Sequence, residues 1–257
     1  MNTKQRILIP IPNKGFDPSE VAIPWKLISE KQVEIVFATP HGEKASTDER
    51  MLNGEKLGFF KSVLKARKDA VLLYFEMIES EAFCNPLKYT DAKATNFDGL
   101  ILPGGHDKTV KEYLESKILQ QLVVAFFESG KPVGAICHGV VLAARSINSK
   151  TGKSVIYNYK TTSLLKTQEL LAYNLTRLWV SDYYLTYPGL TVEDEVKSVL
   201  STTNNFIKGP IPILRDDLKN LNRGFTVKDR NYLSARWPGD VYNFSIEFIN
   251  MLGVITK

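Results

Sequence analysis

The chain has 257 residues, of which 44% are hydrophobic and 24% are charged, and its formal net charge is +5 at pH 7. These values are ordinary for a soluble globular protein of one large α/β domain with insertions, or of two small domains. Two cysteines give no disulfide framework, and no apolar run is long enough for a membrane span or a signal-peptide core. We therefore expect a cytoplasmic protein with no membrane partner. The densest basic cluster, at 65–68, is typical of a solvated helix face, so we expect no nucleic-acid partner either.

Apolar runs that predict buried strands alternate with helical patterns along the chain. We expect strands at 6–12, 33–38, 96–102 and 133–136. We expect one helix that opens at Ser19 as N-cap, and others over 108–129, 138–146 and 241–252. Because the strands are continuously apolar, this alternation indicates a mostly parallel sheet covered by helices on both faces, in a three-layer α/β sandwich.

Two segments interrupt the alternation. Residues 43–93 carry apolar side chains at helical spacing and predict a helical insertion, and residues 176–214 are rich in aromatic side chains. Long excursions of this kind cap an active site or build a subunit interface, although the aromatic side chains fit a plain core equally well. We see no repeat, low-complexity segment or linker, and we expect a single domain over 1–257 with these two insertions.

The strand at 133–136 leads into the most informative position of the chain. Cys137 follows it directly, and the Ala-rich helix begins one residue later. A nucleophile on such a sharp strand-to-helix turn needs small neighbours, and Ala135 and Gly139 supply them. The helix N-terminus favours the thiolate form of the cysteine. The alternative is a buried cysteine that packs as a small apolar side chain, and the complete turn favours the nucleophile.

Other polar residues follow the carboxyl ends of the predicted strands. Glu20 lies in the first helical turn after the first strand, His41 follows the second, and residues 104–106 follow the third. His138 stands beside Cys137 after the fourth strand. Ligands of open α/β sheets bind beyond the carboxyl ends of the strands, so the sequence predicts a site at this edge.

Each of these candidates also has a structural interpretation. Glu20 could serve only the helix dipole, and His138 could only orient the turn, in which case His106 is the alternative base. Gly104 and Gly105 form a tight turn, or they let backbone N–H groups approach an oxyanion together with the N–H of His138. We find no zinc-ligand spacing, P-loop or dinucleotide fingerprint, and we expect no metal and no cofactor.

Four segments together resemble the ThiJ/PfpI superfamily, which shares its fold with class I glutamine amidotransferases. They are residues 19–24 (SEVAIP), 97–106 (FDGLILPGGH), 132–139 (PVGAICHG) and 232–240 (YLSARWPGD). The resemblance implies a flavodoxin-like, class I glutamine amidotransferase-like fold and a homodimer. It also implies that Cys137 is the reactive cysteine, with Glu20 as its carboxylate neighbour and His138 as its adjacent histidine.

The sequence departs from this pattern at one point. Larger members of the superfamily, which the chain resembles in having insertions, carry an acidic third member after the cysteine turn. Asp182 and Glu169 are the candidates here, and neither stands in a matching motif. The downstream His-x-Glu pair of the amidotransferases is missing.

Three functional hypotheses follow. The first is a glutathione-independent glyoxalase or lyase that acts on small reactive carbonyls through Cys137, with Glu20 or a histidine moving the proton. The second is a cysteine hydrolase acting on an amide or peptide, which needs a histidine oriented by an acid. The third is a non-enzymatic stress-response chaperone or redox sensor, in which Cys137 is oxidised as a signal.

Overall fold

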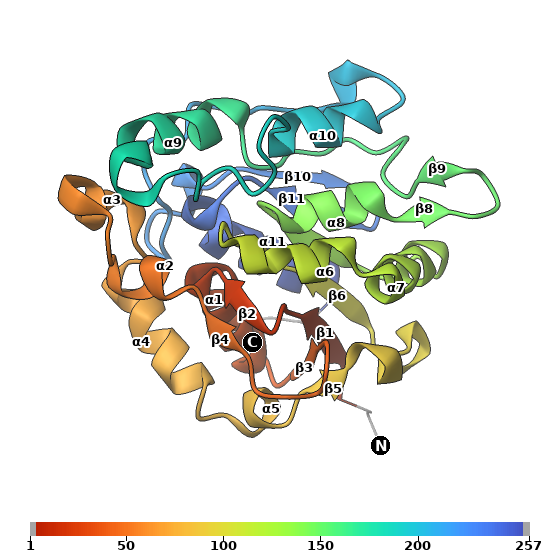
Figure 1. Cartoon of the computed structure of the whole chain (residues 1–257). Coiled ribbons are helices and arrows are strands. Elements are labelled where there is room, and N and C mark those ends of the chain that lie inside the picture. The colour runs from red at the N-terminus through yellow and green to blue at the C-terminus, as the bar shows by residue number, and fades with distance from the viewer. Residues whose placement is uncertain (1–3, 254–257) are drawn as a thin grey trace.

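The computed structural model, which describes residues 4–253, is built on a seven-stranded sheet (Figure 1). The strand order is β10-β11-β7-β6-β1-β3-β5, and every neighbouring pair is parallel except β10 with β11. The strands are β1 (Arg6–Pro10), β3 (Glu34–Thr39), β5 (Leu87–Lys88), β6 (Gly99–Leu102), β7 (Val133–Ile136), β10 (Thr226–Asp229) and β11 (Tyr232–Ala235). The mostly parallel sheet expected from the sequence is confirmed.

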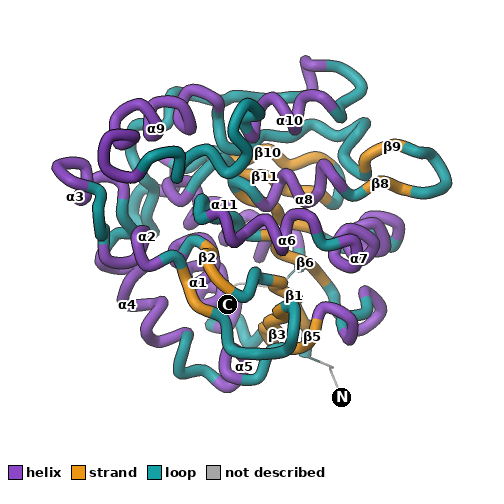
Figure 2. The backbone as a smooth tube through the Cα atoms, viewed as in Figure 1, coloured by secondary structure: helices purple, strands orange, loops and turns teal. Residues whose placement is uncertain are grey.

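Helices cover the sheet in two separate groups, which gives three layers (Figures 1 and 2). The first group consists of α1 (Pro18–Ser29), α4 (Lys68–Met77) and α11 (Val241–Met251), and α1 packs against the other two. The second group consists of α6 (Lys111–Glu115), α7 (Lys117–Glu128) and α8 (Gly139–Arg145), and α8 packs against the other two. Strands β1, β6 and β7 are buried between these groups, as their uninterrupted apolar sequences require.

Two helix boundaries differ from the expectation. The N-cap of α1 is Asp17, whose carboxylate accepts hydrogen bonds from the backbone N–H groups of Ser19 and Glu20, because Pro18 fits the first helical position. The helix expected over 108–129 is divided into a short 3₁₀ turn, α6 and α7. Ser116 separates the two α-helices, and its hydroxyl caps α7 by accepting from the N–H of Leu119.

The first predicted insertion contains mostly short helices. These are α2 (Glu49–Asn53), α3 (Lys61–Leu64), α4 and α5 (Glu81–Cys84), and β5 at its end extends the sheet edge. Two further short strands, β2 (Lys14–Phe16) and β4 (Ser46–Thr47), pair with each other where the insertion begins.

The second excursion begins earlier than the expected residue 176. After a small hairpin of β8 (Ile147–Asn148) and β9 (Lys153–Ser154), the chain forms α9 (Lys166–Val180) and α10 (Val192–Ser198). The sequence did not predict α9 as a helix. Its apolar side chains are spread around the helix, and Leu171, Leu175, Leu178 and Trp179 are exposed.

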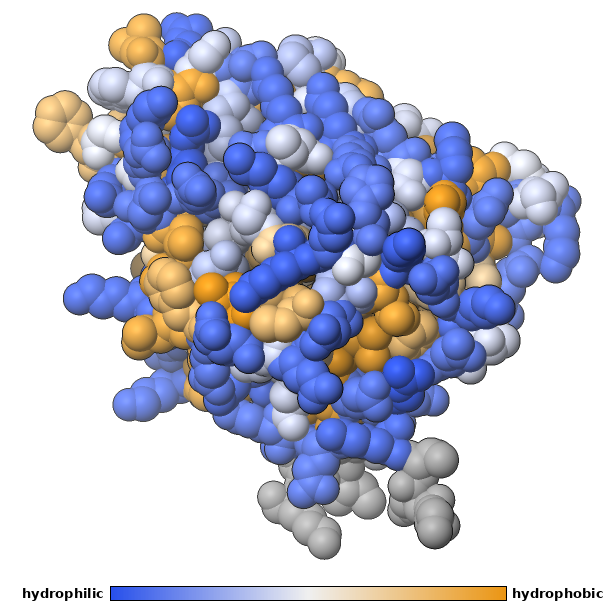
Figure 3. All heavy atoms as spheres, turned by 60° about the horizontal axis from the view of Figure 1, so that its bottom comes forward, coloured by the Kyte–Doolittle hydropathy of each residue, from blue (hydrophilic) through white to orange (hydrophobic). Residues whose placement is uncertain are grey.

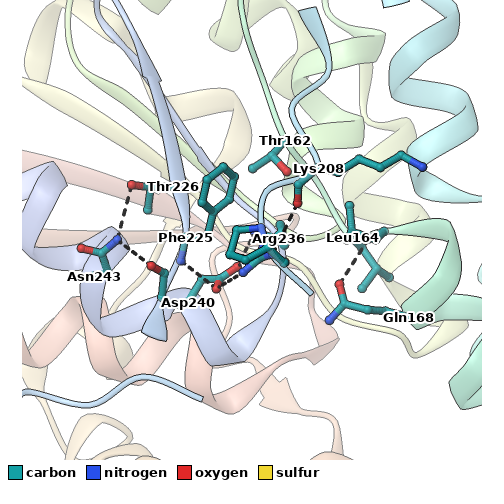
Figure 4. Close-up of polar contacts among 12 residues, drawn as sticks. Thr162, Leu164, Gln168, Lys208, Phe225, Thr226, Arg236, Asp240 and Asn243 are labelled. Atoms are coloured by element: carbon teal, nitrogen blue, oxygen red, sulfur yellow. Dashed lines mark hydrogen bonds and ion pairs between the residues drawn. The ribbon is translucent and has the colours of Figure 1, made fainter. Parts of the chain in front are cut away.

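A buried ion pair ties the end of this excursion to the sheet (Figure 4). Arg236, which follows β11, donates from Nε and Nη2 to the two carboxylate oxygens of Asp240, and both residues are almost fully buried. Its remaining nitrogen, Nη1, donates to the carbonyl oxygens of Lys208 and Pro210. The segment over 208–210 is thereby held against the carboxyl end of β11.

The outer surface is mixed in character. Figure 3 shows mostly hydrophilic side chains on the face it presents, with apolar side chains gathered in patches between them. Among residues 4–253, no helix has both the length and the apolar character that crossing a membrane would require.

Candidate active site

Cys137 lies on the turn that joins β7 to α8, and its backbone is in the left-handed region with φ of 56°. This conformation is costly for a residue that is not glycine, so the surrounding packing must hold it. Gly139 is part of that packing: a Cβ atom at this position would lie 1.9 Å from the carbonyl oxygen of Leu102 at the end of β6. The small residue expected here is therefore needed because α8 begins directly against the neighbouring strand.

The imidazole of His138 lies beside the thiol. Its Nδ1 is 3.5 Å from Sγ of Cys137, and its Nε2 is 3.0 Å from Oγ1 of Thr186. The Thr186 hydroxyl donates its hydrogen to the carbonyl oxygen of His106. Its oxygen is therefore left to accept a hydrogen bond from the N–H at Nε2 of His138. This network assigns the hydrogen to Nε2 and leaves Nδ1 as an acceptor facing the sulfur. The structure thus pairs His138, and not His106, with Cys137.

Thr186 is the residue that sequence analysis missed. It lies between α9 and α10, in the second excursion, and is almost fully buried. No local motif marks it, because a threonine in an aromatic-rich loop has no distinguishing spacing. Only the folding of the excursion over the sheet edge brings its hydroxyl to the imidazole.

The carboxyl group of Glu20 is fully buried on the other side of Gly104. Its Oε2 accepts a hydrogen bond of 2.7 Å from the backbone N–H of Gly104, and its Oε1 has no hydrogen-bond partner among the described residues. A Cβ atom at Gly104 would lie 3.0 Å from that Oε2 and 3.2 Å from Cβ of Cys137. The carboxyl therefore lies close to the cysteine, and glycine is required between them.

Burial favours the uncharged form of each of these groups. Desolvation raises the pKa of the Cys137 thiol and that of the Glu20 carboxyl well above their usual ranges, and it lowers the pKa of His138 well below its own. The N–H of His138 opposes the shift of the thiol, but desolvation is the larger effect. The thiolate expected at the helix N-terminus stays a prediction: the N–H of His138 favours it, and desolvation opposes it.

The glycine pair after β6 differs in part from its expected role. The N–H of Gly104, expected as an oxyanion donor, is already bonded to Glu20. A Cβ atom at Gly105 would lie 2.5 Å from the carbonyl oxygen of Gly15, so this glycine is needed for close packing of the turn. Gly104 thus holds the Glu20 carboxyl and its N–H is not free to bind an oxyanion, whereas Gly105 serves the packing of the turn.

His106 lies on the far side of His138 from the cysteine. The two rings meet edge to face with centroids 5.0 Å apart, and the ring of Tyr184 contacts His106 at the same distance. Burial lowers the pKa of His106 to about 4, so its ring is neutral at neutral pH. His106 also lines the cavity that lies next to this group of residues.

The remaining candidates lie away from the thiol. His41 is on the surface, 3.9 Å from a carboxylate oxygen of Glu112. Asp182 forms an exposed ion pair with Lys108, and Glu169 accepts a hydrogen bond from the N–H of Val192 at the start of α10. Neither acid is a partner of His138, and a threonine hydroxyl occupies the place expected for an acidic third member.

The chain is similar to several known proteins in sequence and in fold. A deglycase of Thermococcus kodakarensis is 23% identical over 172 residues, which cover 65% of this chain and 69% of that protein. A glutathione-independent glyoxalase of Schizosaccharomyces pombe is 26% identical over 160 residues, covering 61% of this chain and 62% of that protein. The crystal structure of glyoxalase III from Candida albicans has a TM-score of 0.68 over 96% of this chain and 97% of that chain, at 20% identity, which shows a shared fold.

The match to a family model is longer than either of these two sequence matches. A family model described as ThiJ/PfpI family-like covers residues 11–207, from the end of β1 through the cysteine turn and past Thr186. With the parallel sheet and the cysteine between β7 and α8 both in place, this chain belongs to the ThiJ/PfpI-like family.

Proposed function

We propose that the protein is a cysteine-dependent, glutathione-independent glyoxalase that converts small 2-oxoaldehydes into 2-hydroxy acids. The observation that carries the proposal is the arrangement of Cys137, His138 and Glu20, in which Nδ1 of the imidazole lies 3.5 Å from the thiol sulfur and the buried carboxyl lies close to the cysteine. The deglycase and glyoxalase activities of the Thermococcus and Schizosaccharomyces relatives support the same class of chemistry.

The first step is addition of the thiol to the aldehyde. Sγ of Cys137 bonds to the aldehyde carbon while Nδ1 of His138, 3.5 Å away, takes the thiol proton. The aldehyde oxygen takes a proton from Glu20, which gives a neutral hemithioacetal, an imidazolium and a carboxylate. Thr186 supports this step because it accepts from Nε2–H of His138 and so stabilises the imidazolium.

The second step moves a proton between the two carbons. The Glu20 carboxylate takes the hydrogen from the former aldehyde carbon while the imidazolium protonates the ketone oxygen, which forms an enediol. Glu20 then returns its proton to the second carbon, and His138 takes the hydroxyl proton of the first. The result is a thioester of Cys137 with a 2-hydroxy acid. A carboxyl with a raised pKa suits both parts of this transfer, because its carboxylate form is a stronger base than an ordinary carboxylate.

Water completes the cycle. It adds to the thioester carbon, and the carbon–sulfur bond breaks as the sulfur takes the proton of His138. The other proton of this water goes to the Glu20 carboxylate, and the 2-hydroxy acid formed releases its own proton to the solvent, so the product leaves as a carboxylate and all three residues return to their neutral forms. The overall change adds one water molecule and needs no external oxidant or reductant.

The hydrolase hypothesis receives less support from the same geometry. Amide hydrolysis depends on an imidazole held by an acid, and Nε2 of His138 meets the hydroxyl of Thr186 instead.

The proposal is tested by measuring methylglyoxal consumption and lactate formation without glutathione. We expect turnover by the native protein, a loss of at least about a hundredfold in Cys137→Ala and Glu20→Gln, and native activity in Cys84→Ala, which changes an exposed cysteine. A folded native protein that forms no lactate would rule out the proposed reaction for methylglyoxal.

A further inference from the structure

A cavity of about 210 Å³ lies next to the candidate active site. Its volume is several times the roughly 30 Å³ that one water molecule occupies in the liquid. Its walls come from α3, α9, the segment after residue 210 and the turn after β11, and Figure 1 shows α3 beside α9. Trp179 of α9 meets Phe60, just before α3, in an edge-to-face contact with centroids 6.4 Å apart, so these two elements are packed together.

The walls of this cavity are mainly apolar. Branched aliphatic side chains face it from three parts of the chain, namely Val63, Leu64, Leu164, Leu171, Leu175 and Ile213. Several of them are exposed to solvent, which is costly unless a ligand covers them. An apolar ligand group would gain from displacing the water here.

The floor of the cavity is polar and incompletely satisfied. It is formed by Asp17, His106, Tyr184 and Arg215. Tyr184 and His106 are more than nine-tenths buried, yet among the described residues Oη of Tyr184 and Nδ1 of His106 have no hydrogen-bond partner. Buried polar atoms of this kind need a partner. Together with the charge of Arg215, they fit a ligand that carries oxygen atoms at one end.

This polar floor adjoins the residues around the thiol. The His106 ring contacts the His138 ring, and the carboxylate of Asp17 accepts from the N–H of Glu20. Cys137 itself is only 1% exposed and is not among the residues that line the cavity. The aldehyde of a ligand on this floor would therefore have to pass the rings of His106 and His138 to reach the sulfur.

Resting on the proposed function, we infer that this cavity selects 2-oxoaldehydes with a long apolar substituent over methylglyoxal. The Tyr184 hydroxyl and the Arg215 guanidinium would donate to the two carbonyl oxygens before the aldehyde carbon reaches Cys137, and the alkyl chain would lie along the aliphatic walls. Methylglyoxal would leave most of that wall in contact with water. Each methylene that a hydrophobic pocket recognises is worth roughly tenfold or more in kcat/KM.

The test compares methylglyoxal with pentylglyoxal as substrates. We expect native kcat/KM to be at least about tenfold higher for pentylglyoxal. Ala172→Phe, which fills the cavity from α9, should remove that preference. Asn174→Phe adds a similar side chain at an exposed position on the other side of α9 and should leave the preference unchanged. Equal use of both substrates by the native protein, or a preference that survives Ala172→Phe, would overturn the inference.

A binding measurement separates this inference from the proposed reaction. Calorimetric titration of the native protein with 2-hydroxyheptanoate and with lactate reports the cavity without any turnover. Tighter binding of 2-hydroxyheptanoate, lost in Ala172→Phe and kept in Asn174→Phe, would support the cavity assignment even if neither aldehyde is consumed. Absence of binding by both acids, together with absence of turnover, would overturn the cavity assignment as well as the proposed function.

Discussion

At the scale of single residues, the site brings together three buried ionisable groups. The thiol, imidazole and carboxyl of Cys137, His138 and Glu20 each have a pKa displaced toward the uncharged form, and desolvation is the largest cause for each. Sequence motifs pointed to three residues that the structure brings close together. The motifs could not indicate the direction of these pKa shifts, because burial depends on atoms distant in the chain.

Thr186 is expected to act as a positioning residue for His138. Thr186→Val keeps the shape but removes the hydroxyl that accepts from Nε2–H, so the imidazole can adopt the other tautomer and present a hydrogen to the sulfur. We expect a fall of about tenfold to a hundredfold in kcat with little change in KM. Thr186→Ser retains a hydroxyl and should recover most of the activity. Equal activity of the valine and serine variants would show that the hydroxyl has no such role.

The protonation of Cys137 is expected to appear in its alkylation by iodoacetamide. Because burial raises the pKa of the Cys137 thiol, its rate should keep rising above pH 8.5, where an ordinary cysteine is half ionised. At alkaline pH, where the Glu20 carboxyl also ionises, its charge adds to this shift, so Glu20→Gln should move the upper part of the curve to lower pH. Mass spectrometry separates Cys137 from the exposed Cys84 in the same sample. A curve that levels off below pH 7 would contradict a neutral resting thiol.

At the scale of elements, the sequence predicted what local patterns control and missed what the tertiary structure controls. The apolar run at 133–136 is β7 to the residue, because it is short, buried and bounded by Pro132 and the cysteine turn. By contrast, β10 alternates polar and apolar residues at the sheet edge, and its pairing with β11 depends on the turn at Asp229 and Arg230. The broken helix over 108–128 shows the same limit, since Ser116 inside a helical pattern is ambiguous until its hydroxyl is seen to cap α7.

The contact between α8 and β6 gives a prediction about stability. In a helix, Gly→Ala normally stabilises, but a Cβ atom at Gly139 would lie 1.9 Å from the Leu102 carbonyl oxygen. We expect Gly139→Ala to lower the free energy of unfolding by about 2–3 kcal/mol, measured by urea denaturation. Gly130→Ala is the matched control, because its Cβ would meet no atom within 4 Å and only its positive φ opposes it. That variant should lose about 1 kcal/mol. Equal losses would mean that α8 moves freely away from β6.

At the scale of the whole molecule, stability depends on carboxyl groups that folding has buried. Desolvation raises the pKa of Asp48 to about 6 and those of Glu169 and Asp216 to about 7. A carboxyl whose pKa is higher in the folded state binds its proton more tightly there, so its contribution to stability falls as pH rises from about 4 through the folded pKa. Buried His106, with its pKa lowered to about 4, acts in the opposite direction between pH 4 and 6.5. Single substitutions are therefore needed to separate these contributions.

Asp216 is the carboxyl best suited to that experiment. It is almost fully buried and accepts hydrogen bonds from the N–H groups of Tyr242 and Asn243 in the first turn of α11, and Asp216→Asn keeps one acceptor oxygen but cannot ionise. We expect the stability of this variant, relative to native, to increase by about 2–4 kcal/mol between pH 4.5 and pH 8, measured by urea denaturation at several pH values. Asp217→Asn is the control. The Asn220 amide lowers the pKa of Asp217, so the contribution of Asp217 to stability changes only below about pH 4. The stability of Asp217→Asn relative to native should therefore not change between pH 4.5 and pH 8. A flat profile for Asp216→Asn as well would mean that the Asp216 carboxylate remains hydrated in the folded protein, and that the first turn of α11 is open to water.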